Sequence, residues 1–288
     1  WLKHIQHSGL QRYFRDRKEG TMCFLLCPCI THYKDVTPPD IGGELIDSHD
    51  ASSHTMTGDT MPLVEIQIPP QHTMVGEPGA MCYFQDGISM ESKFDDGARV
   101  DEPGPCFKCK MNCARCCSGE AMSMVHFTND TNGPRTVAFG NSIPSSIIAV
   151  DLSDVPDKVL FTMNGSFIFG AQGTRIDVVR SDCQQCCFGA GLCFQKIDGN
   201  GIVFLSGGGT VIRQDLEDET HRVDPASLLA FTTGLDVSVK KAGTCLTMCC
   251  GGEGFGLTTL SGTGSYWLAS SPTSEQISYA VQFLPPKK

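Results

Sequence analysis

Cysteine is the residue type in this chain that could take part in the widest range of chemistry, and most of the cysteines lie in three clusters. Sixteen of the 288 residues are cysteine. Each cluster ends in a vicinal pair and runs into a glycine-rich, apolar stretch. The clustered cysteines, with two that stand just before the first cluster, are Cys106, Cys109, Cys113, Cys116, Cys117, Cys183, Cys186, Cys187, Cys245, Cys249 and Cys250. Because the clusters recur within a longer common pattern, the sequence predicts a unit repeated three times.

The spacing within the clusters is compatible with thiolate ligation of zinc or of another metal. Cysteines separated by two residues, as in Cys113 and Cys116, are common zinc ligands. Zinc ribbons, however, place roughly 15–20 residues between two such pairs, whereas only three residues separate Cys109 from Cys113. Four interpretations therefore stay open: thiols that fill buried loops without any cofactor, a pooled metal site, S-acylation, and disulfide or redox chemistry.

A second group of cysteines lies near the N-terminus and is the better candidate for S-acylation. Cys23, Cys27 and Cys29 fall in the apolar stretch 22–30, next to the basic stretch 3–18. This stretch is far shorter than the roughly 20 apolar residues of a membrane-spanning helix. The sequence therefore predicts no transmembrane segment and leaves open a peripheral membrane contact through acylated thiols.

The chain divides by composition into an extension and a body. Residues 1–60 predict a mostly irregular extension that contains a short basic helix, the cysteine-rich apolar stretch and an acidic tether over 35–60. Such a tether, rich in aspartate, proline, glycine and serine, buries little apolar surface. Residues 61–284 contain the three repeats and form the predicted β domain.

The flanks of the clusters determine the predicted fold class, which is all-β. Before and after each cluster, apolar and polar residues alternate with a period of two, and glycines punctuate them. We interpret each unit as a four-stranded meander, with one hairpin before the cluster and one after it. The hairpins expected after the clusters are 121–127 with 136–139, 192–197 with 202–205, and 255–260 with 265–268. Because one unit is too small to bury its own core, we expect three units that share a core about a pseudo-threefold axis.

Charge and motif content exclude several classes of function. The net charge is −10, and the repeats carry no cluster of lysine and arginine of the kind that neutralises phosphates, so no nucleic-acid partner is expected. The chain has no nucleophile elbow, phosphate loop, zinc-protease motif or dinucleotide fingerprint, so we do not expect an enzyme. The cysteine content lies below the roughly 8–10% typical of secreted disulfide scaffolds, which favours free thiols in a reducing, intracellular compartment.

Several short motifs together resemble the AIM24 family, which is itself described as similar to the tryptophan RNA-binding attenuator protein. The motifs occur in the family's order over about residues 61–270: 76–81, the loop Cys113–Ala121, 148–152, 164–167 and 201–206. The resemblance implies three attenuator-like β-units in one chain. Bacterial members are soluble and of unsettled role, whereas fungal members are mitochondrial and associated with the inner membrane and its organising and respiratory complexes. The family supplies no catalytic residues, and residues 1–60 and the cysteine enrichment depart from it.

These observations lead to three functional hypotheses. The first is a non-enzymatic structural or scaffold protein, in which residues 1–60 and the sheet surfaces bind subunits of a larger, membrane-associated complex. The second is a metal-binding or thiol-redox protein that uses the cysteine clusters. The third is a peripheral membrane protein acylated at Cys23, Cys27 or Cys29. By the resemblance, the expected compartment is the mitochondrial inner membrane, with the cytoplasm or another organelle as the alternative.

Overall fold

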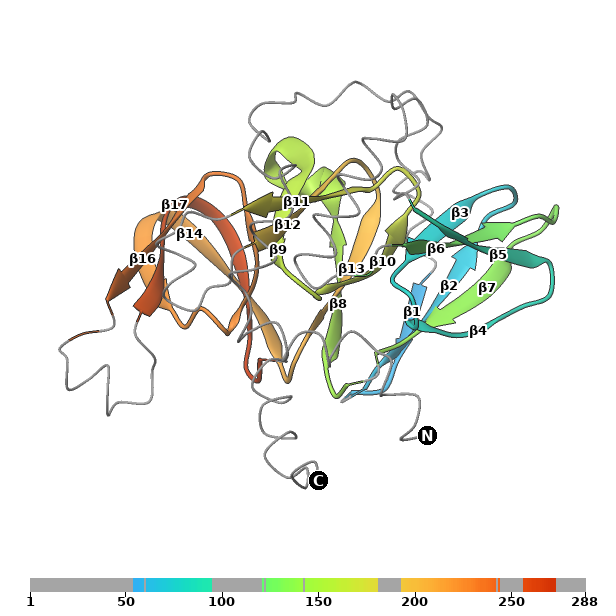
Figure 1. Cartoon of the computed structure of the whole chain (residues 1–288), viewed down its shortest axis with the longest axis horizontal. Coiled ribbons are helices and arrows are strands. Elements are labelled where there is room, and N and C mark those ends of the chain that lie inside the picture. The colour runs from blue at the N-terminus through green and yellow to red at the C-terminus, as the bar shows by residue number, and fades with distance from the viewer. Residues whose placement is uncertain are drawn as a thin grey trace, which may run out of the picture.

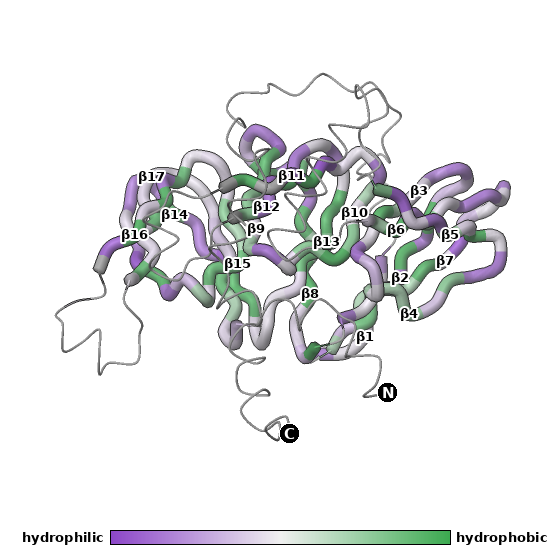
Figure 2. The backbone as a smooth tube through the Cα atoms, viewed as in Figure 1, coloured by the Kyte–Doolittle hydropathy of each residue, from purple (hydrophilic) through white to green (hydrophobic). Residues whose placement is uncertain are grey.

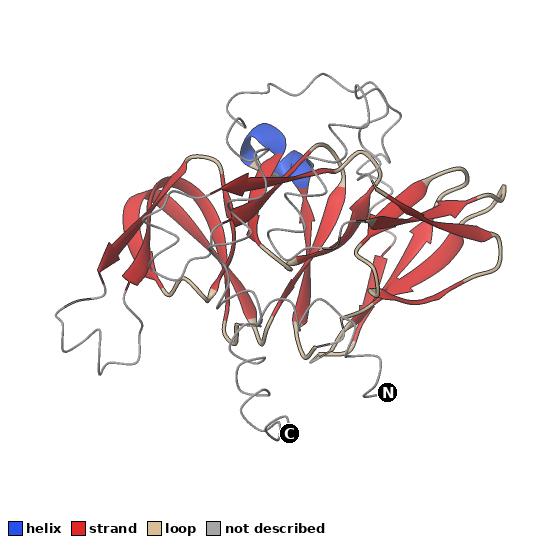
Figure 3. Cartoon of the chain, viewed as in Figure 1, coloured by secondary structure: helices blue, strands red, loops and turns tan. Residues whose placement is uncertain are grey.

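The structure, a computed structural model, describes residues 54–59, 61–94, 121, 123–141, 143–180, 193–241, 243 and 256–272. In these residues it contains seventeen strands and two short 3-10 turns, which confirms the all-β prediction (Figure 3). The strands are β1 His54–Thr57, β2 Leu63–Ile68, β3 Thr73–Gly76, β4 Met81–Phe84, β5 Ile88–Lys93, β6 Met124–Asn129, β7 Arg135–Phe139, β8 Ser146–Asp151, β9 Val159–Met163, β10 Phe167–Ala171, β11 Arg175–Arg180, β12 Cys193–Asp198, β13 Ile202–Gly207, β14 Val211–Val223, β15 Leu228–Thr232, β16 Leu235–Lys241 and β17 Gly256–Ala269. The 3-10 turns are η4 Leu152–Asp154 and η5 Pro156–Lys158.

The strands repeat in order and pairing, which identifies three units. The first unit is β2–β7, the second is β8–β13, and the third is β14–β17, in which the long β14 and β17 each take the place of two strands. In every unit the first strand pairs with the sixth, and the fourth pairs with the fifth. Each unit thus has six strand positions rather than the four of the predicted meander.

The first and second units each contribute to two sheets, whereas the third lies wholly in the seven-stranded sheet, so that neighbouring units are joined by shared sheets. The strand orders are β1-β2-β7-β4, β5-β6-β3-β10-β13-β8, and β11-β12-β9-β15-β17-β14. Strand β16 also pairs with β17. The three units lie side by side along the longest axis of the molecule (Figure 1). The predicted pseudo-threefold axis is therefore not confirmed. The first sheet also includes β1, which lies within the predicted extension.

The predicted hairpins are wrong in their pairing. Strands β6 and β7 follow one another through a turn, as expected, but β6 belongs to the six-stranded sheet and β7 to the four-stranded sheet. Strands β12 and β13 are likewise divided between two sheets, and the segments 255–260 and 265–268 form the single strand β17. Alternation predicts that a segment is extended, but it does not specify the partner. These turns are corners between sheets.

The core consists of three apolar clusters, each built from neighbouring units. Within the first cluster, Phe139 of the first unit stacks on Phe169 of the second with ring centroids 4.0 Å apart, and Phe169 stacks on Phe204 at 4.3 Å. The second cluster combines residues of all three units, and the third lies around β15 and β17. Apolar residues follow the strands of all three units (Figure 2). Neighbouring units thus share apolar residues, but in three clusters and not in the single core about an axis that the sequence predicted.

Candidate functional site

The predicted site residues lie outside the residues that the structure describes. For the three clusters, the strands before and after are described. The three clusters fall in the connections 94–123, 181–192 and 242–255, each of which joins the fourth strand of a unit to its fifth. The residues so placed are Cys106, Cys109, Cys113, Cys116, Cys117, Cys183, Cys186, Cys187, Cys245, Cys249 and Cys250. Cys23, Cys27 and Cys29 also lie outside the described residues.

These three connections occupy the same place in the fold. The strands on either side of each connection pair antiparallel up to its ends, with Lys93 opposite Met124, Arg180 opposite Cys193, and Lys241 opposite Gly256. Each cluster therefore sits in the loop of a hairpin, and it is the same hairpin in all three units. The three units thus share this hairpin, and a cysteine cluster lies in the connection of each.

Cys82 is the only cysteine whose side chain the structure describes. It is exposed, and it is the extra residue of a β-bulge in β4, between Met81 and Tyr83. Among the described residues, no group of three or more histidine, cysteine, aspartate or glutamate side chains could hold a metal ion. In the same part of the chain, no helix is long and apolar enough to cross a membrane.

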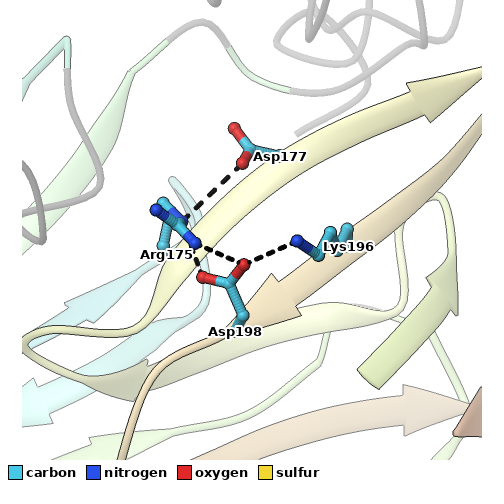
Figure 4. A network of polar contacts seen from close by, with 4 residues as sticks. All are labelled: Arg175, Asp177, Lys196 and Asp198. Atoms are coloured by element: carbon cyan, nitrogen blue, oxygen red, sulfur yellow. Dashed lines mark hydrogen bonds and ion pairs between the residues drawn. The ribbon is translucent and has the colours of Figure 1, made fainter. Parts of the chain in front are cut away.

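A charged network that sequence reasoning missed links β11 to β12 in the second unit (Figure 4). Arg175 donates two hydrogen bonds of 2.6 Å to the two carboxylate oxygens of Asp198. Lys196 Nζ lies 3.0 Å from the same carboxylate, and Arg175 Nε lies 3.8 Å from Asp177 Oδ2. The signal in the sequence was the matching of opposite charges, since Arg175 faces Asp198 and Asp177 faces Lys196 across the two strands.

The chemistry of this network is structural. The side chains of Arg175 and Asp198 are only 12% and 10% exposed, so each charge needs its partner to compensate for lost hydration. The two positive and two negative side chains balance one another, and the bidentate geometry fixes the arginine. We therefore assign the network to holding the β11–β12 hairpin together, at the end opposite to its cysteine segment.

A cavity of about 280 Å³ lies at the junction of the first and second units. Its wall combines the turn at Glu77, residue Asn141 after β7, and Phe167 and Ile168 of β10. Ala121, which follows the first cysteine cluster in the sequence, also lines it. The amide nitrogen of Asn141 lies 2.5 Å from the hydroxyl oxygen of Ser206 and ties the wall to β13.

Exposed apolar side chains gather on the first unit and its neighbour β1. Among the described residues, seven large hydrophobic side chains are exposed, and six of them lie between residues 54 and 94. The six are Met56, Met61, Tyr83, Phe84, Met90 and Phe94, and the seventh is Ile212 of the third unit. Exposed apolar side chains that are concentrated on one part of a domain favour an interaction site there. This uneven distribution makes the first unit the candidate binding surface.

Comparison with known proteins places the chain in a family. A family model described as "Mitochondrial biogenesis AIM24" matches residues 54–271, which is most of the chain and all of the described strands. The chain belongs to the AIM24 family. The match begins at β1 and extends beyond β17, and it confirms the resemblance carried by the short motifs.

Two streptococcal proteins are similar to this AIM24 family member. An uncharacterized protein of Streptococcus pyogenes serotype M6, M6_Spy0233, is 22% identical over 231 residues, which are 78% of this chain and 87% of the streptococcal protein. The crystal structure of protein SPYM3_0169 from Streptococcus pyogenes superposes with a TM-score of 0.61 at 19% identity and covers 80% of this chain and 99% of that chain. At this level of identity, the second likeness establishes the fold.

Proposed function

We propose that this AIM24 family member is a non-enzymatic structural protein that binds subunits of a larger, membrane-associated assembly. The observation that carries the proposal is the concentration of exposed apolar side chains on the first unit. The word "biogenesis" in the family description is compatible with a role in assembling other proteins. The word "mitochondrial" in the same description makes the mitochondrion the first compartment to examine.

Within the first unit, Met90 and Phe94 form the part of this surface that variants can address most cleanly. Met90 lies on β5 and Phe94 directly follows it, and both side chains are more than half exposed. Both stand near the end of β5, with only three residues between them, so one partner surface can contact both. A partner that covers both side chains stabilises the complex by about 25 cal/mol for each square ångström of apolar surface that it removes from water.

The experiment is native-state separation of detergent extracts from cells that express the tagged full chain. We expect the chain to migrate in a complex much larger than itself, and we expect Met90→Glu combined with Phe94→Glu to release it. Ile212→Glu is the matched control, because Ile212 is equally apolar and exposed but lies on the third unit. A complex of unchanged size and composition in the Met90/Phe94 variant contradicts the proposal, as does migration of the wild-type chain as a free protein.

A second candidate function, thiol-based metal binding, has one specific observation in its favour. The three cysteine clusters lie in the same hairpin connection of three topologically equivalent units. Repeated placement is what a shared ligand or a shared structural need would produce. Elemental analysis of protein purified without chelator distinguishes a bound metal from a purely structural role of the cysteines. A metal protein is expected to contain one or more equivalents of zinc, iron or copper per chain. A content well below one equivalent excludes this function.

A further inference from the structure

The units are joined to one another by a junction that occurs twice with the same register. At the first junction β3 pairs with β10, and at the second β9 pairs with β15. In both, the second strand of one unit lies antiparallel to the third strand of the next. The β-bulge in the third strand also recurs, at Ile168 in β10 and at Leu229 in β15. The junction is thus a defined device of this fold.

At the two ends of the row of units, one second strand and one third strand lack the junction partner that their counterparts have. The third strand of the first unit is β4, which has the same bulge at Cys82 and pairs only with β7. The counterpart of the second strand in the third unit is residues 219–223 of β14, which pair only with β17. Within the described part of the chain, no strand pairs with the outer edge of either. Strands β4 and β14 lie at opposite ends of the molecule, so they do not meet within one chain (Figure 1).

The side chains of β4 have the composition of a junction without its covering strand. By the bulge and the register, Tyr83 corresponds to Phe169 and Ala230, and Phe84 corresponds to Gly170 and Phe231. Phe169 and Phe231 are 0% and 6% exposed in their junctions, whereas Tyr83 and Phe84 are 41% and 38% exposed. The difference indicates that the first unit is missing the neighbour that the other two have.

We propose that β4 of one copy of this chain pairs with residues 219–223 of β14 in a second copy, and so repeats the internal junction between molecules. The register of β3·β10 and β9·β15 then sets Val223 opposite Tyr83, Arg222 opposite Phe84, and His221 opposite Gln85. At the second internal junction, the corresponding pair is Phe161 and Phe231, which stack with centroids 5.1 Å apart.

A guanidinium facing an aromatic ring preserves the attraction of that stacked pair. Arginine planes bind favourably to the faces of phenylalanine rings. The side chain of Arg222 is exposed, and it has no ion pair or hydrogen bond within the described residues. Arg213 of the same strand already shows the contact, since its guanidinium lies 5.5 Å from the centre of the Trp267 ring. Arg222 and Phe84 are therefore a complementary pair across the proposed interface.

A second copy is the occupant that the two edges favour over an unrelated strand. Charged residues and a bulge normally prevent indiscriminate pairing of an edge, and β14 has both, with a bulge between Glu217 and Glu219. Such an edge pairs only with a strand whose bulge and register match its own. Strand β4 has the bulge of β10 and β15, the two strands that form the internal junctions. Because the interface joins two different surfaces, it builds open chains or closed rings.

The proposal rests on the fold and is independent of the proposed function, because the test uses only the purified full chain. Sedimentation velocity over a concentration series, under reducing conditions, is expected to show species larger than one chain that increase with concentration. Phe84→Lys places an ammonium group against Arg222 and should shift the population to monomer, whereas Phe84→Glu should retain assembly. Ile212→Lys, at an equally exposed apolar residue outside the interface, should leave assembly unchanged.

Two further measurements guard against a variant that merely fails to fold. Combining Phe84→Lys with Arg222→Glu restores opposite charges and should restore assembly, which a misfolded chain would not do. A photoreactive phenylalanine analogue at position 84, in a mixture of light and isotope-labelled copies, should cross-link to residues 219–223 of another copy. The proposal is overturned by a wild-type chain that is monomeric throughout, by cross-links to β4 of another copy, or by cross-links to residues 1–53 of the same copy.

Discussion

Gly199 approaches Gly173 so closely that a Cβ atom on Gly199 would lie 2.4 Å from the Gly173 carbonyl oxygen. The third unit repeats the relationship, since a Cβ on Gly262 would lie 2.4 Å from the carbonyl oxygen of Gly234. Both Gly199 and Gly262 have positive φ angles, of 126° and 111°. Two glycines at each of these places thus allow the chain to pass close to itself where β11 or β16 begins.

Gly199→Ala is therefore expected to destabilise the protein strongly. It adds a backbone clash to the cost of a positive φ angle, and together these should lower the free energy of unfolding by several kcal/mol, at the upper end of what single substitutions do. Denaturant unfolding followed by circular dichroism measures the loss. Gly79→Ala is the matched control, because Gly79 also has a positive φ angle, of 91°, but nothing lies within 4 Å of its Cβ position. It should cost only about 1 kcal/mol. Equal losses in the two variants would contradict the clash.

The same glycines show how far the sequence predicts this fold. Glycines before Ile88, Thr174 and Leu235 punctuate alternating segments, and the alternation after them predicts β5, β11 and β16. The turns after β4 and β10 do not themselves reveal that the chain passes there from one sheet to the next, because that depends on contact with another segment. The strands were predictable for this reason, whereas their partners were not.

The candidate binding surface could not be predicted from the sequence, for a related reason. Tyr83 and Phe84 stand in the same pattern as Phe169 and Phe231, and all four side chains are aromatic. Only the presence or absence of a neighbouring strand decides whether such residues are buried. The cysteine clusters were easier to place, because their position between two alternating segments located them in one connection of each unit.

Arg175→Ala should destabilise the second unit by about 2–4 kcal/mol, because it leaves the carboxylate of Asp198 largely buried without its bidentate partner. The control is the exposed ion pair of Arg213 with Asp215, whose coupling a double-mutant cycle separates from the other contacts of Arg213 with Ser265 and Trp267. Exposed pairs contribute about 0–1 kcal/mol. A double-mutant cycle of Arg175→Ala and Asp198→Ala, followed by chemical unfolding, should give a coupling well above that of Arg213 and Asp215. Coupling no larger than that of the exposed pair would mean that the network contributes little.

Phe169→Ala should cost about 3–5 kcal/mol, the usual loss for truncating a fully buried phenylalanine. Phe169 stacks between Phe139 and Phe204, so its removal opens a cavity where the first two units join. Hydrogen exchange should report faster opening in both units, not in the second alone. Phe94→Ala, at a ring that is exposed, is the control and should change stability by less than about 0.5 kcal/mol. If protection were lost in the second unit only, the shared core would not couple the units.

Stability at alkaline pH should depend on Tyr266. Burial raises the pKa of its phenol above the usual value of about 10, and its hydroxyl lies 2.7 Å from Nδ1 of His221. A tyrosine that ionises less readily in the folded state than in the unfolded chain contributes stability below the unfolded pKa. This contribution is lost as the pH rises through the folded pKa. In Tyr266→Phe the loss of stability between neutral pH and the alkaline range should therefore be smaller than in the wild type, although the variant starts lower because the bond to His221 is gone. Urea unfolding at a series of pH values measures the two slopes, and ultraviolet difference titration follows the phenolate directly. Parallel slopes, or a Tyr266 phenolate that appears at or below the usual pKa, would contradict the effect of burial.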